Sequence, residues 1–152
     1  MSVVESKLVE LGYTLPSPPE PIGNYRAAAR SGKVMWMSGV GSRRADGLTI
    51  SGKLGADLTV EQGYEAARWC ALNLLARMKV ELGDLDRVTG ILKVVGMVNS
   101  SPDFEEQAKV VDGASDLFVE LFGDAGQHGR SAPGMAVLPK NTAVIVDCVI
   151  EI

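Results

Sequence analysis

Apolar residues recur every three or four positions in two stretches of the chain, which is the period of an amphipathic helix. The first stretch begins after Thr59, where Thr-Val-Glu-Gln forms a capping box, and it ends at Gly83. The second begins in the segment Ser-Ser-Pro-Asp, with Pro102 just inside the helix, and it stops before Gly123. The positions that define the two stripes are Val60, Tyr64, Ala67, Ala71, Leu74, Met78 and Leu82, and Val111, Ala114, Phe118 and Leu121. The pattern therefore predicts two long helices.

The N-terminus follows a different pattern. Residues 2–11 have the apolar spacing of a short helix, which Gly12 ends. Four prolines follow from Pro16 to Pro21, and such a segment is extended because proline fixes φ and lacks an N–H. We therefore expect residues 1–20 to form a helix and a proline-rich extension, and residues 21–152 to form the main domain.

The remaining apolar segments are short, β-branched and bounded by glycine or proline, as strands are. The expected strands are a pair joined by a tight turn at Ser31-Gly32, a short strand at 48–51 within an irregular loop, one strand at 88–98, and two strands after residue 133 separated by Pro139-Lys140-Asn141. This order predicts an α+β domain in which both long helices cover one face of a mixed sheet.

The other face of this sheet has no predicted cover. The last strand is apolar on both sides, with Val144, Val146, Cys148 and Ile150 on one side and Ile145 and Val149 on the other. If both helices lie on one side, a second copy in a closed oligomer is the economical cover for the other side. Loops of the same chain are the alternative.

Composition narrows the class of protein. The 152 residues fit one domain, and a net charge of −4 with 5% aromatic residues argues against a dedicated nucleic-acid binder. The chain has no apolar run of membrane-spanning length, and its acidic N-terminus does not resemble a secretion signal, so we expect a cytoplasmic protein without membrane contact. Cys70 and Cys148 stand in apolar surroundings and predict reduced, buried thiols rather than a disulfide or a catalytic pair.

The sequence contains few motifs that are typical of a catalytic, cofactor-binding or metal-binding site. Gly39-Val40-Gly41 is followed by Arg44 where a dinucleotide-binding loop would have its third glycine, and the single histidine leaves no metal cluster. We therefore expect no metal or other cofactor. Arg130 lies in a glycine-flanked loop and offers a planar, two-pronged donor to a carboxylate or phosphate. A solvent-facing arginine is the plainer interpretation of that loop.

Two segments carry a resemblance to a known family. HGRSAPGMAVLPKNTAVIVDCVIEI resembles the C-terminal signature of the RidA/YjgF family, also called the endoribonuclease L-PSP family, and PIGNYRAAARSGKVMWMSG resembles its opening. The likeness runs from about Pro21 to Ile152. The segment VVDGASDLFVELFG further resembles a longer subgroup that carries an extra N-terminal helix.

The resemblance implies a chorismate-mutase-like fold, a homotrimer with clefts between subunits, and hydrolysis of reactive enamines and imines to 2-oxo acids and ammonia. Arg130 matches the family's arginine that holds the substrate carboxylate, and Tyr25 matches its cleft tyrosine. Gly39 matches the glycine whose backbone approaches the ligand. Ala132 stands where many members have a cysteine that contributes mainly its backbone amide.

Two departures bear on catalysis. Asp112 stands where relatives commonly have asparagine, and Ile145 stands where the family has its catalytic glutamate. An aliphatic side chain cannot transfer a proton to or from the attacking water. Asp147, on the same strand face and about 7 Å further along, is the first candidate substitute, and Asp112 is the second.

The sequence thus supports three functions. The first is a RidA-like protein that binds small carboxylate metabolites such as 2-oxo acids through Arg130, with enamine or imine deaminase activity dependent on Asp147 or Asp112. The second is a non-catalytic ligand-binding or stress-interaction protein that uses the same cleft. The third is an endoribonuclease or translation inhibitor, which the acidic charge disfavours.

Overall fold

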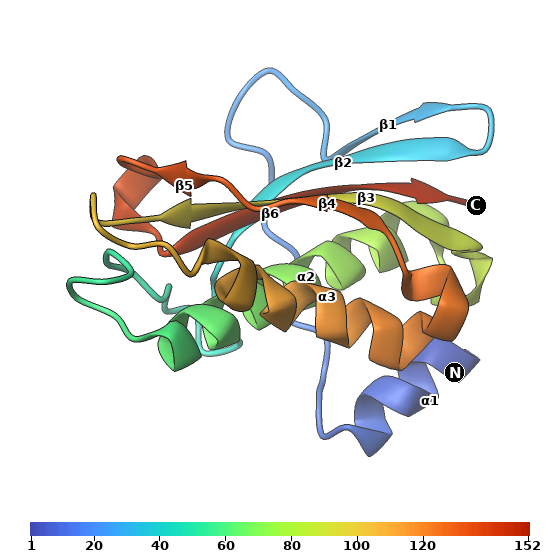
Figure 1. Ribbon diagram of the computed structural model, residues 1–152. Coiled ribbons are helices and arrows are strands. Elements are labelled where there is room, and N and C mark those ends of the chain that lie inside the picture. Colours follow the sequence, from blue (N-terminus) through green and yellow to red (C-terminus); the bar gives the residue numbers. More distant parts are fainter.

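Six strands form one mixed sheet in the computed structural model, which describes all 152 residues (Figure 1). The strands are β1 (Ala28–Ser31), β2 (Val34–Gly41), β3 (Gly90–Asn99), β4 (Gly129–Ser131), β5 (Gly134–Met135) and β6 (Val144–Glu151). Their order across the sheet is β1-β2-β6-β3-β4, and β5 also pairs with β3. The pairs of β3 with β4 and β5 are parallel and the others are antiparallel, so the predicted mixed sheet is confirmed.

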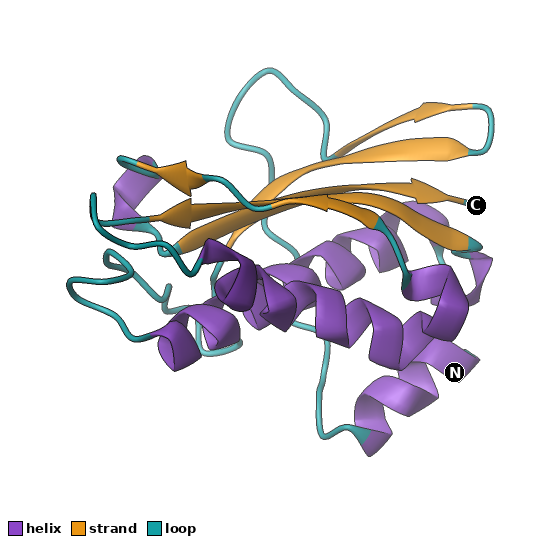
Figure 2. Cartoon of the chain, viewed as in Figure 1, coloured by secondary structure: helices purple, strands orange, loops and turns teal.

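The two long helices, α2 (Val60–Leu82) and α3 (Gln107–Phe122), cover one face of this sheet (Figure 2). The capping box at the start of α2 is present, since Thr59 Oγ1 accepts from the Gln62 amide at 3.2 Å and Gln62 Oε1 accepts from the Thr59 amide at 2.9 Å. The helices cross closely at Gly113, where an added Cβ would lie 2.0 Å from the Tyr64 carbonyl oxygen. The α+β class and the helical layer are therefore as predicted.

Three local predictions are wrong. Helix α3 begins at Gln107 rather than near Pro102, because the preceding residues form a turn in which the Phe104 amide donates to the Ser101 carbonyl at 3.1 Å. Residues 48–51 form only isolated bridges, through Thr49 and Ser51. The loop expected around Arg130 contains strand β4, which β3 recruits by parallel pairing.

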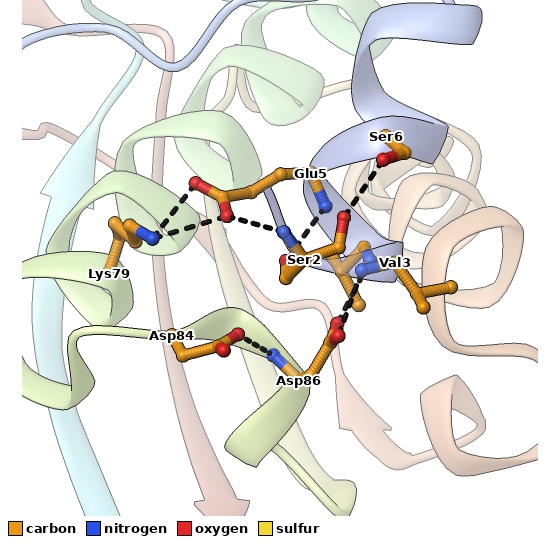
Figure 3. A network of polar contacts seen from close by, with 8 residues as sticks. Ser2, Val3, Glu5, Ser6, Lys79, Asp84 and Asp86 are labelled. Atoms are coloured by element: carbon orange, nitrogen blue, oxygen red, sulfur yellow. Dashed lines mark hydrogen bonds and ion pairs between the residues drawn. The ribbon is translucent and has the colours of Figure 1, made fainter.

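The N-terminal helix α1 (Val3–Glu10) is fixed to the domain by polar contacts at its first turn (Figure 3). Asp86 accepts from the Val3 and Val4 amides at 2.8 and 3.0 Å, and Glu5 pairs with Lys79 at 3.0 Å. These hydrogen bonds from backbone amides lower the pKa of the Asp86 carboxyl. Val4 and Leu8 then enter the hydrophobic core, so this helix is part of the packed structure.

The face of the sheet opposite the helices carries no helix (Figure 1). On β6, Val144, Val146, Cys148 and Ile150 are buried toward the helices, whereas the alternate residues Ile145, Asp147 and Val149 are only half-buried. Trp36, paired with Val149 across the strands, is 48% exposed. We call this surface the open face and define it by Trp36, Lys93, Val95, Met97, Ile145, Asp147 and Val149.

Both cysteines are free and buried, as the sequence predicted. Burial raises the pKa of the Cys70 and Cys148 thiols, which keeps them neutral and unreactive. None of the helices has the combination of length and apolar character that crossing a bilayer requires.

Candidate functional site

A cavity of about 310 Å³ opens beside the second half of β2. Strand β1 pairs only with Val34–Met37, so the following residues of β2 lack a strand on that side. The proline-rich segment, the turn at 139–142 and the end of β2 form the walls, and Tyr25 and Gly39 both line the space. The structure therefore brings together two of the residues that the sequence selected.

Ile145 forms another wall of the same cavity. A Cβ added to Gly39 would lie 3.0 Å from Ile145 Cγ2, so these two positions are in direct contact across a bulge between β2 and β6. The position at which the sequence expected an acid thus faces the cavity. An isoleucine there supplies an apolar surface and no proton.

Arg130 lies elsewhere, on the edge strand β4. Its Nη1 donates to Asp112 Oδ1 at 2.7 Å and to Ser115 Oγ at 3.1 Å, and its Nη2 donates to the Ala108 carbonyl at 3.3 Å. The side chain is 24% exposed, so the interpretation of a solvent-facing arginine is wrong. Of its five N–H donors, Nε–H and one Nη2–H have no protein acceptor and remain free for a ligand.

Helix α3 holds Arg130 in this orientation. Asp112 and Ser115 are one turn apart on the helix, and Ser115 Oγ lies 2.8 Å from His128 Nε2. His128 Nδ1 lies 2.7 Å from the Gly126 carbonyl oxygen, which links the residues before β4 to the same network. Asp112 therefore positions Arg130, a contact that the sequence did not predict.

Arg130 and Tyr25 do not meet within one chain. Strand β4 is at one edge of the sheet, and the cavity is beside β2, three strands away. At about 4.8 Å per strand, that separation is roughly 14 Å. Ala132 directly follows β4 and packs against the core on the Arg130 side. One subunit thus carries two separate groups of the selected residues.

Asp147 belongs to neither group and lies in the middle of the open face. Its cross-strand neighbour is Val95, and its side chain makes no hydrogen bond or ion pair. Burial raises the pKa of the Asp147 carboxyl above its ordinary value, because the apolar surroundings disfavour the charged form.

Replacing Asp147 with asparagine is expected to raise the melting temperature at neutral pH. The folded-state pKa is raised, so the fold loses stability as the pH rises through the ordinary pKa of aspartate toward the raised value. The gain should shrink as the pH falls through this range and vanish well below the ordinary aspartate pKa of about 3.9, where the wild-type carboxyl is protonated in both states. Thermal scans of both proteins from acid to neutral pH measure it, and an Asp147→Asn variant that is less stable at neutral pH would contradict this account.

Sequence reasoning missed two residues of the cavity wall, Arg77 and Lys140. Arg77 falls outside the apolar stripe predicted for α2, yet it is only 6% exposed. Its neighbours Leu74 to Met78 are all buried, so the helix is covered on more than one side. A polar residue within a run of small and aliphatic residues was the signal available in the sequence.

No cluster of three His, Cys, Asp or Glu side chains that could hold a metal is present.

Comparisons with known proteins agree with this fold. A family model described as "YjgF/chorismate mutase-like, putative endoribonuclease" matches residues 5–152. Protein TCP17 of Trypanosoma cruzi is 44% identical over 158 residues, which cover 100% of this chain and 99% of that protein.

Two solved structures are also similar over nearly the whole chain. A protein of unknown function from Agrobacterium tumefaciens is 39% identical with a TM-score of 0.92, covering 99% of this chain and 92% of that one. A structure from Shewanella oneidensis, described as "a putative endoribonuclease", is 37% identical with a TM-score of 0.94, covering 98% of this chain and 99% of that one. The resemblance drawn from the sequence motifs is confirmed.

Proposed function

The chain belongs to the YjgF/chorismate mutase-like family, and from this premise we propose that it binds small carboxylate-bearing metabolites in a cleft formed between copies of the chain. The observation that carries the proposal is that the residues selected from the sequence form two separate groups on one subunit. Arg130 is held ready on β4, and the Tyr25–Gly39 cavity lies beside β2. A ligand that contacts both groups needs two subunits.

Arg130 supplies the recognition of the carboxylate. Its contacts to Asp112, Ser115 and Ala108 fix the guanidinium before a ligand arrives, which reduces the entropy lost on binding. The free Nε–H and Nη2–H can donate to the oxygens of one carboxylate. The partly exposed position admits a ligand from the surface.

Assembly follows from the open face. Trp36, Val95, Met97 and Val149 form an apolar surface on the side of the sheet that carries no helix. A heterologous contact that joins the β4 side of one copy to the cavity of the next gives a ring when the rotation between copies closes, and an open filament when it does not. A homotrimer is the ring that we propose, with one cleft at each of its three contacts.

Hydrolysis is the reaction that such a cleft could perform, and Ile145 limits it. Water adds to the C=N carbon of an imine, the resulting carbinolamine loses ammonia, and a 2-oxo acid remains; both steps need proton transfer. Asp147 is the available acid, on the same strand face as Ile145 and with a raised pKa. The one acid that lines the cavity is the exposed Glu20, and Ile145 stands where the catalytic acid is expected, so we place ligand binding ahead of turnover.

Binding is tested by calorimetric titration of the wild-type protein with 2-oxopentanoate. We expect Arg130→Ala to weaken the affinity by at least about tenfold, the effect of losing a charge-assisted hydrogen bond. Arg68→Ala is the matched control. Like Arg130, Arg68 forms an ion pair with a carboxylate on α3, that of Glu120 at 2.6 Å, but it belongs neither to the Arg130 group nor to the cavity. Equal affinities for the wild type and Arg130→Ala would refute the proposal.

Turnover is tested with 2-aminoacrylate generated in solution and pyruvate as the product measured. We expect the wild type to add little to the uncatalysed rate and Ile145→Glu to accelerate it, since the new carboxylate would face the cavity. An Ile145→Glu variant that folds and binds 2-oxo acids without acceleration would show that position 145 does not reach the ligand.

A further inference from the structure

Arg77 is a buried charge without a partner. The side chain is 6% exposed and lines the cavity, it makes no hydrogen bond or ion pair, and its Nη2 is fully buried without an acceptor. A guanidinium stays protonated in proteins, so it cannot escape this cost by losing its proton. Burying an unpaired charge is strongly unfavourable, so an unsatisfied group of this kind in a native protein calls for a specific explanation, of which a bound ion is one.

The cavity has an excess of positive charge around Arg77. Arg43 and Lys140 also line it, and neither side chain forms an ion pair or a hydrogen bond. The one carboxylate on the wall belongs to Glu20, which is exposed. Three cations against one acid in a partly enclosed space favour an anionic occupant.

The turn that carries Lys140 is held in an unusual conformation. Lys140 and Asn141 have φ values of 54° and 57°, the left-handed region, which asparagine adopts readily but lysine does not. Asn99 Nδ2 donates to Asn141 Oδ1 at 3.0 Å, and this contact fixes the turn beside the cavity. Such backbone strain persists where the surrounding structure imposes it and is concentrated at functional sites.

We propose that Arg77 binds a second anionic group of the ligand, so that the protein's ligands are 2-oxo or 2-imino acids with an anion at each end. The inference rests on the proposed function, in which Arg130 of a neighbouring copy holds the first carboxylate. Val40 and Ile145 provide apolar walls for the carbon chain between the two anions.

The size of the cavity agrees with a ligand of this class. Its volume of about 310 Å³ lies at the lower end of the range of roughly 300–1,000 Å³ that small-molecule sites have. 2-Oxoglutarate has ten non-hydrogen atoms and carries a carboxylate at each end. A distal carboxylate and a distal phosphate would both satisfy Arg77.

The test is a calorimetric titration with 2-oxoglutarate and 2-oxopentanoate, which share a five-carbon chain and differ in the distal carboxylate. We expect the wild type to bind 2-oxoglutarate about tenfold to one hundredfold more tightly. Arg77→Met should bring the affinity for 2-oxoglutarate down to that for 2-oxopentanoate, and Arg68→Met, on the same helix but ion-paired to Glu120, should keep the preference. Titration with 3-phosphonooxypyruvate shows whether the distal group is a phosphate.

The outcomes separate the two proposals. Equal affinities of the wild type for the two five-carbon ligands, or a preference that survives in Arg77→Met, would overturn the role of Arg77 and leave the role of Arg130 intact. A 2-oxoglutarate affinity that falls in Arg77→Met but not in Arg130→Ala would refute the proposed function and keep the anion site.

A second variant covers the case in which Arg77→Met does not fold. Glu20→Gln changes an exposed side chain at the cavity wall and is expected to tighten 2-oxoglutarate binding by removing a like charge. An unchanged affinity would count against an anion in this cavity.

Ligand-free Arg77→Met should melt at or above the wild-type temperature, because it removes an unpaired buried charge. A folded variant that melts well below the wild type would show that Arg77 is already satisfied within the protein.

Discussion

Replacing Trp36 with glutamate is expected to leave the chain as a folded monomer of 16.1 kDa. Trp36 is 48% exposed on the open face and pairs with Val149 across the strands. If this face is the contact between copies, the substitution puts a carboxylate into an apolar interface, where the loss of hydration costs several kcal/mol. Aromatic residues at the centre of an interface also contribute a large share of its binding energy. The assembly should therefore dissociate completely at micromolar concentrations.

Light scattering after size-exclusion chromatography measures this mass directly. Val80→Glu is the matched control, because Val80 is 60% exposed but belongs to helix α2, in the layer on the opposite side of the sheet. The control should keep the wild-type mass, and circular dichroism should show both variants folded. A wild-type protein that already runs as a monomer, or a Trp36→Glu variant with the wild-type mass, would contradict assembly through the open face.

Helix α2 was predictable to its ends because its signals are local. Thr59 and Gln62 cap the first turn within four residues of sequence, and Gly83 ends the helix with a φ of 78°. The start of α3 was missed for the opposite reason. Glu106 makes no side-chain cap bond, and Gln107 donates to the Phe104 carbonyl at 2.8 Å, so the residues after Pro102 continue as a turn.

The sequence did not predict the contacts of the residues that it selected. Arg130 was identified from its motif, whereas its pairing with Asp112 depends on the parallel addition of β4 to β3 beside helix α3. The contact of Gly39 with Ile145 depends on a bulge between two strands that are far apart in sequence. Long-range register of this kind leaves no pattern in the sequence of either segment alone.

Arg77 shows the limit of periodicity most clearly. Its position outside the apolar stripe of α2 predicts a solvent-facing residue, and a helix packed on one side only would place it there. In this protein β2 and the proline-rich segment also line the space beside α2, so the residue is enclosed. The extended segment was predicted from its prolines, but where it lies on the domain was not.

Two variants that each lack one half of the proposed cleft are expected to lose affinity for the ligand and to regain it when they are mixed. Arg130→Ala removes the guanidinium on β4 that would bind the ligand carboxylate, and Tyr25→Ala removes a wall of the cavity beside β2. Each variant alone should bind 2-oxopentanoate at least about tenfold more weakly than the wild type. When equal amounts of the two are unfolded and refolded together, some contacts pair an intact Arg130 with an intact Tyr25 on the next subunit.

The stoichiometry of tight binding in that mixture is the most direct measurement of whether the cleft is shared between subunits. Random mixing in a head-to-tail ring regenerates the wild-type cleft at about one quarter of the contacts, since each position has an even chance of either variant. We predict that calorimetry of the mixture recovers wild-type affinity at about that fraction of sites. Recovery of no tight sites, with both variants folded and mixed, would show that Arg130 and Tyr25 do not act on one ligand between two copies.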